Sequence, residues 1–197
     1  MKKLYLPIIA VAALLMSSCG GSPARSGFES FSKELCEQEN LSFTSRVRAE
    51  YDDRCAEFTL AYTADSEGCT ITVVSPEIIR GVSAHVRAGE TALEYGGVIL
   101  DTGMLDGFGL SPMSALPVMV EAMKTAYIDS AWEADGQLAA MLAASDELNV
   151  EVHLDKYTKT PVSAELSSNG RVRVFAEISG WTYVPAQTGE TDTVKEE

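Results

Sequence analysis

The two histidines are the first residues of this chain to consider for catalysis. His85 and His153 each stand between two apolar residues in a stretch of alternating pattern. In an extended strand they point away from the face that carries those apolar neighbours. A solvent-facing strand histidine is the commoner meaning of such a position, and a base or metal ligand is the alternative. The chain has no Gly-x-Ser-x-Gly elbow and no His-Glu-x-x-His pair. The sequence therefore predicts no enzyme, and a hydrolase that uses either histidine is the weakest hypothesis.

Acidic side chains are abundant but lack the spacing of a catalytic or metal site. The chain has 29 Asp and Glu against 15 Lys and Arg, which gives a formal net charge of −14. Most acids fall in turns or at outward strand positions, so no buried pair for glycoside hydrolysis is expected. Asp52 and Asp53 suit only weak calcium binding, because no spaced calcium loop surrounds them. The charge argues against nucleic acid as a partner. We expect no metal and no cofactor.

The four cysteines follow no zinc pattern. There is no Cys-x-x-Cys, and neither histidine lies near a cysteine. Cys19 belongs to the leader described next, which leaves Cys36, Cys55 and Cys69. An odd number permits one disulfide outside the cytoplasm, and buried free thiols are the alternative, which an anaerobic habitat would favour.

The N-terminus resembles the leader of a bacterial lipoprotein. Two lysines precede a 13-residue apolar run, residues 4–16, which is shorter than the roughly 20 residues of a membrane span. The run ends in Leu14-Leu15-Met16-Ser17-Ser18-Cys19, which is similar to a lipobox. This resemblance implies a signal peptide over residues 1–18 and a diacylglycerol and palmitate anchor on Cys19. An ordinary signal peptide with an incidental cysteine is the alternative. We predict an extracytoplasmic protein held at the outer or plasma membrane, with a flexible tether over residues 19–27.

Alternating and helical periods divide the rest of the chain. Residues 28–39 repeat apolar side chains at three and four positions, which predicts a short helix. About six strands with short polar turns follow, then a helical region over residues 111–129 that Pro117 divides, then three or four more strands. The turn Ser168-Asn169-Gly170 predicts the last hairpin. Residues 185–197 predict a disordered acidic tail. The fold class is α+β: a curved antiparallel sheet forming an open half-barrel over residues 28–184, with helices packed in its concave face.

This order of elements resembles the LolA/LolB/LppX-like superfamily of lipoprotein carriers and lipid-binding lipoproteins. Three segments carry the resemblance: residues 75–81 (Ser-Pro-Glu-Ile-Ile-Arg-Gly), 93–100 (Leu-Glu-Tyr-Gly-Gly-Val-Ile-Leu) and 155–161 (Asp-Lys-Tyr-Thr-Lys-Thr-Pro). They are similar to the family's short helix after the third strand, its next strand pair and its late turn. The resemblance implies an eleven-stranded half-barrel whose hollow holds acyl chains, without catalysis.

The central helix supplies the candidate binding residues. It is apolar nearly all round, so we expect it to be buried on more than one side. Leu116, Met119, Met123 and Tyr127 are the predicted lining of a lipid cavity, since methionine adapts to irregular apolar ligands. Methionine as ordinary core filler is an equal alternative.

The leading hypothesis is a membrane-anchored lipoprotein that binds or transfers a hydrophobic ligand, either a lipid or an acylated protein. Movement of residues 103–111 would admit the ligand. The alternative is a non-catalytic interaction or sensor module with a plugged core, which engages an envelope protein and contains no cavity.

Overall fold

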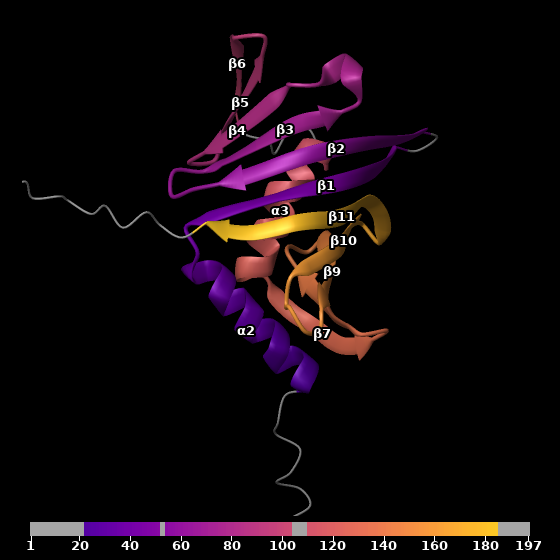
Figure 1. Ribbon diagram of the computed structural model, residues 1–197. Coiled ribbons are helices and arrows are strands. Elements are labelled where there is room, and N and C mark those ends of the chain that lie inside the picture. Colours follow the sequence, from indigo (N-terminus) through magenta and orange to yellow (C-terminus); the bar gives the residue numbers. More distant parts are fainter. Residues whose placement is uncertain (1–21, 52–53, 104–109, 185–197) are drawn as a thin grey trace, which may run out of the picture.

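The computed structural model describes residues 22–51, 54–103 and 110–184. The signal peptide, Cys19, Asp52 and Asp53, most of the loop 103–111 and the tail 185–197 lie outside the described residues. One antiparallel sheet of eleven strands dominates the fold, in the order β6-β5-β4-β3-β2-β1-β11-β10-β9-β8-β7 (Figure 1). The strands are β1 (Asn40–Tyr51), β2 (Arg54–Ala64), β3 (Cys69–Ser75), β4 (Ser83–Arg87), β5 (Glu90–Tyr95), β6 (Val98–Gly103), β7 (Tyr127–Ala134), β8 (Gln137–Ala143), β9 (Leu148–Asp155), β10 (Pro161–Ser168) and β11 (Arg171–Val184). The helices are α2 (Pro23–Glu37), α3 (Pro112–Thr125) and the 3-10 turn η2 (Glu77–Ile79).

Two meanders build the sheet and meet in its middle. The first runs outward from β1 to β6, and the second returns from β7 to β11, which pairs with β1. Alternation gives each strand an inner and an outer side: Leu41, Phe43 and Val47 are buried on β1. Asn169 and Gly170 both have positive φ, at 51° and 72°, which is the geometry of a tight hairpin turn. The open sheet with helices on one face confirms the predicted fold class.

The first helix begins earlier than the sequence predicts. The expectation was a tether over residues 19–27 and a helix from residue 28, but α2 starts at Pro23. The hydroxyl of Ser22 accepts a hydrogen bond from the backbone N–H of Arg25 at 3.2 Å, and proline at the first helical position suits a helix start. Gly27 lies against Leu138, where a Cβ would come within 3.2 Å of that side chain. Gly27 therefore lets the helix pack closely against Leu138, although glycine alone would predict a linker.

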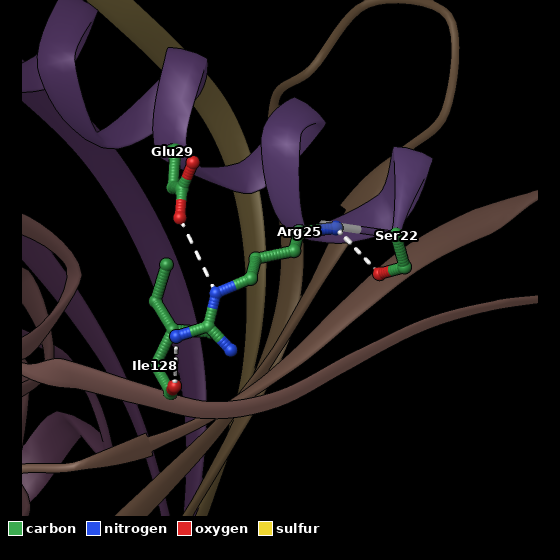
Figure 2. A network of polar contacts seen from close by, with 4 residues as sticks. All are labelled: Ser22, Arg25, Glu29 and Ile128. Atoms are coloured by element: carbon green, nitrogen blue, oxygen red, sulfur yellow. Dashed lines mark hydrogen bonds and ion pairs between the residues drawn. The ribbon is translucent and has the colours of Figure 1, made fainter. Parts of the chain in front are cut away.

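Arg25 fixes this helix to strand β7. Its Nη2 donates a hydrogen bond of 2.7 Å to the carbonyl oxygen of Ile128, and its Nε pairs with Glu29 Oε1 at 3.3 Å (Figure 2). Its guanidinium also lies 5.7 Å from the ring centroid of Tyr127. These contacts anchor the start of α2, while Phe28, Phe31 and Leu35 bury its apolar side.

The central helix is continuous, and it ends before residue 129. Ser111 and Ser114 cap its start reciprocally, and Pro117 lies inside it instead of dividing it. Ala126 is extended, with ψ 153°, and strand β7 begins directly after it. Residues 127–129 are therefore strand, contrary to the prediction: Tyr127 and Ile128 pair with β8, and the register shifts between Ile128 and Ser130.

The helices fill the sheet unevenly. Helix α2 packs on β7, β8 and α3, while α3 lies across β1–β3 and β8–β10 (Figure 1). The inner faces of β4 and β5 are left beside open space, which the next section describes. Within the described part of the chain, no helix combines the length and apolarity needed to cross a bilayer.

Candidate binding site

An apolar cavity of about 420 Å³ opens between the start of α3 and strands β2–β5. Nine apolar and two hydroxyl side chains form its wall, and none of them is charged. The wall consists of Phe58, Val73, Ile79, Val82, Ala84, Val86, Thr91, Leu93, Ser111, Pro112 and Met113. Its volume lies within the ~300–1,000 Å³ typical of small-molecule sites. We call this space the apolar cavity.

Paired residues of β4 and β5 form the floor of the apolar cavity. Ala84 opposes Leu93, and Val86 opposes Thr91, so both pairs point to the same face of the sheet. Ala84 is buried and Leu93 is half-buried, with its free side toward the space. Ile79, from the turn η2, contributes to the wall next to the strands. The sequence alternation on these short strands is the signal that identifies these residues.

A second, larger space of about 850 Å³ continues along the inner side of the sheet toward the end of α3. Val86 and Thr91 line both spaces, so the two meet at this cross-strand pair. The second space differs in chemistry, because Asp65, Glu121 and Lys124 contribute to its wall. We call it the polar cavity.

Helix α3 presents one side to both cavities. Met113 lines the apolar cavity, while Pro117, Glu121 and Lys124 line the polar cavity. Spacings of four, four and three residues place these four side chains on one face of a helix. The two cavities therefore form one trough beside α3, apolar at the start of the helix and charged at its end.

The predicted lining residues occupy other positions. Leu116, Met119 and Met123 are buried, with exposures of 0%, 0% and 1%, and belong to the core on the opposite side of α3. None of the three is among the residues that line either cavity. Tyr127 borders the polar cavity from β7 and is 67% exposed. The structure thus does not bring the four together, because both sides of α3 are apolar at its start and sequence alone does not show which side faces the sheet.

Two weakly acidic groups line the deep wall of the polar cavity. Burial raises the pKa of the Tyr62 phenol well above its ordinary value of 10.0, and the neighbouring Cys69 raises it further. Burial likewise raises the pKa of the Cys69 thiol, although its hydrogen bond with Tyr62 opposes this shift. Both groups are neutral at pH 7, so the charge of this cavity comes from its carboxylates and its lysine.

The histidines lie on the outer face of the sheet, as predicted. His85 contacts the Thr70 hydroxyl and a Glu94 carboxylate oxygen, each at 3.1 Å. His153 contacts Glu151 at 2.9 Å. Neither histidine is among the described residues that line the apolar or the polar cavity. A search of the described residues finds no group of three or more side chains able to hold a metal ion.

The three described cysteines are free thiols. Cys36 and Cys55 are exposed, so the alternative of buried free thiols does not hold for these two. Cys36 lies near the end of α2. Its thiol donates a hydrogen bond of 3.5 Å to the carbonyl oxygen of Lys124 near the end of α3. Cys69 alone is half-buried and belongs to a cavity wall.

Comparison with known proteins finds similarity only among solved structures. No family model matches the chain, and no curated protein does. A DUF1329 family protein from Desulfovibrio piger is 8% identical, with a TM-score of 0.48, over 87% of this chain and 96% of that one. A LolA superfamily protein from Nitrosomonas europaea is 12% identical, with a TM-score of 0.44, over 84% and 96%. A Clostridioides difficile structure of the CwlD amidase in complex with the GerS lipoprotein matches at 13% identity and a TM-score of 0.42, over 84% and 98%.

These likenesses concern the fold alone. The chain itself has the eleven-stranded open sheet and the packed helices that the resemblance to the LolA/LolB/LppX-like superfamily implies. The predicted architecture, a single open antiparallel sheet with helices packed on one face, is confirmed.

Proposed function

We propose that this chain binds a hydrophobic ligand, such as the acyl chain of a lipid or an acylated protein, in the apolar cavity. The observation that carries the proposal is the uncharged wall of eleven residues around a space of about 420 Å³. Burial of each methylene from water contributes about 0.8 kcal/mol. A chain of ten or so methylenes therefore binds without any polar contact. The role is one of holding or handing over, and not of catalysis.

The interaction module with a plugged core is the competing proposal. It requires a hollow that the protein's own helices fill. Helix α3 does fill the hollow below β1 and β8–β10, with Leu116, Met119 and Met123 buried there. A space of several hundred cubic ångströms beside the same helix counts against this alternative.

We also propose that Cys19 anchors the domain to a membrane. Helix α2 begins at Pro23, so only three residues separate the helix from the predicted lipid-bearing cysteine. Three extended residues span at most about 11 Å. The domain then sits close to the head groups, which shortens the path of an acyl chain from membrane to cavity. Labelled palmitate should enter the wild-type chain and not Cys19→Ser, and equal labelling of both would refute the anchor.

Filling the apolar cavity tests the binding proposal. The probe is N-phenyl-1-naphthylamine, an uncharged dye that fluoresces in apolar surroundings, added to the full chain carrying Cys19→Ser. Ala84→Trp and Leu93→Trp place an indole in the cavity, and each should lower the affinity for the dye at least ten-fold. Ala92 lies between Thr91 and Leu93 and faces the opposite side of β5. Ala92→Trp is therefore the matched control and should bind the dye as the parent does.

A complementary measurement uses native mass spectrometry of the chain released from membranes. A co-purified species of lipid mass is expected, and it should be lost in Leu93→Trp. If the parent carries no lipid and does not bind the dye, the proposal is refuted.

A further inference from the structure

The trough beside α3 changes from apolar to charged along its length. Its apolar part ends at the pair Val86 and Thr91, which also begins the polar part. An apolar tail that lies in the apolar cavity and reaches this pair continues directly into the polar cavity. A ligand that occupies both spaces must have a polar end.

Three charged side chains line the polar cavity, and the two acidic residues among them, Asp65 and Glu121, are exposed to solvent. Asp65 comes from the turn after β2, while Glu121 and Lys124 come from the last turns of α3. Asp65 Oδ1 accepts hydrogen bonds from the backbone N–H groups of Glu67 and Gly68, at 2.8 and 3.1 Å. Glu121 Oε1 accepts one from the Thr125 hydroxyl at 3.2 Å. Among the ion pairs of the described residues, none involves Asp65, Glu121 or Lys124.

We propose that the polar cavity is a head-group site, and that it selects amphiphiles whose head carries an ammonium group. This inference rests on the proposed function, because the tail of the same molecule occupies the apolar cavity. Two carboxylates against one lysine give the site a negative balance, and the whole chain carries −14. A purely anionic head is repelled by the negative balance of the site and by the negative charge of the whole chain. The neutral Tyr62 and Cys69 at the deep wall add no charge that would reverse this balance.

Lys124 distinguishes two kinds of ammonium head. A simple alkylammonium head is attracted by the two carboxylates and repelled by the lysine. A head that also carries phosphate can place its anionic part toward Lys124 and its ammonium toward Asp65 or Glu121. Both kinds of head share the ammonium group, and the assay distinguishes a simple alkylammonium from a head that also carries phosphate.

The experiment compares heads on one constant tail. Four tetradecyl amphiphiles, each below its micelle concentration, displace N-phenyl-1-naphthylamine from the full chain carrying Cys19→Ser. Their heads are trimethylammonium, phosphocholine, maltoside and sulfate. Because the tail is the same, differences in displacement report the head. Phosphocholine has no net charge, so its comparison with maltoside excludes general attraction to an acidic protein.

Both ammonium heads should displace the dye at concentrations about two- to five-fold lower than maltoside, the size expected for partly exposed charge pairs. Tetradecyl sulfate should be the weakest. Glu121→Gln should remove the preference and leave maltoside unchanged. Glu165→Gln makes the same change of charge on β10, away from both cavities, and should preserve the preference. Lys124→Gln should weaken phosphocholine and strengthen trimethylammonium.

The outcomes separate the two proposals. Equal displacement by all four heads, or an unchanged preference in Glu121→Gln, overturns the head-group site and leaves the apolar cavity standing. A parent chain that never binds the dye refutes the proposed function itself. A preference that Glu121→Gln and Glu165→Gln weaken equally would assign the effect to overall charge and also overturn the site.

Discussion

Two methionines on opposite sides of α3 give a direct test of how this helix is placed. Met119 is fully buried, with 0% exposure, and Met113 lines the apolar cavity. The side chains are identical and both lie in α3, so the difference between Met113→Ala and Met119→Ala chiefly measures how tightly each methionine is packed.

The magnitudes follow from the surroundings of each side chain. Truncating a fully buried methionine to alanine costs about 2–5 kcal/mol, because it removes contacts on all sides and leaves a cavity. Met113 already borders open space, so its truncation should cost about 1 kcal/mol or less. For a domain of this size, each kcal/mol lowers Tm by roughly 2–4 °C. Met119→Ala should therefore lower Tm by roughly 4–20 °C, and Met113→Ala by only a few degrees.

Urea unfolding followed by circular dichroism measures the loss of stability in both variants. Dye binding measures the effect of each substitution on the apolar cavity. Met113→Ala should weaken binding of N-phenyl-1-naphthylamine, while folded Met119→Ala should bind it normally. Met119→Leu conserves volume and should cost less than about 1.5 kcal/mol, which keeps the test valid if Met119→Ala does not fold. Equal costs for the two alanine variants would refute the assignment of the helix faces.

Two further predictions concern the contact between α2 and β7 and the reactivity of the cysteines. Arg25→Ala removes the 2.7 Å hydrogen bond to the Ile128 carbonyl and should cost about 1–2 kcal/mol of unfolding free energy, since a bond to a charged group is worth about 1.5–3 kcal/mol and Arg25 is partly exposed. Arg46→Ala, whose partner carboxylate lies 4.0 Å away on the surface, should cost less than about 0.5 kcal/mol, and equal losses would contradict the bridge between α2 and β7. In iodoacetamide labelling at pH 8, Cys69 should react more slowly than the exposed Cys36, because burial raises the pKa of the Cys69 thiol and lowers its thiolate fraction. Peptide mass spectrometry reads both rates, and Cys69 reacting as fast as Cys36 would show that the polar-cavity wall is open.

Local patterns in the sequence predicted most of the strands. Alternation on β1 places Leu41, Phe43 and Val47 in the core. The pair Asn169-Gly170 is typical of a hairpin turn, and it forms one here. These features depend on neighbours a few residues apart, so they need no knowledge of the rest of the fold. The outward placement of His85 follows from the same alternation.

The start of α2 could not be predicted from the sequence, because tertiary packing overrides local helix propensity there. Gly27 and the residues before it suggest a linker, but Ser22 caps a helix whose glycine fits closely against Leu138. That contact joins residues more than one hundred positions apart. No local pattern contains it.

Only the tertiary structure decided which side of α3 faces the two cavities. Met113 and Met119 are equally apolar, and the sequence favoured Met119 as lining. The structure buries Met119 among the strands on one side and leaves Met113 and Glu121 facing the trough on the other. That choice depends on the pairing of β1 with β11, which closes the two meanders around the helix. The sequence by itself determined the charge and most of the strands, since these depend on residue types and on the alternation of neighbouring residues. The cavity and its polarity gradient arise from contacts between distant segments, and so only the folded chain reveals them.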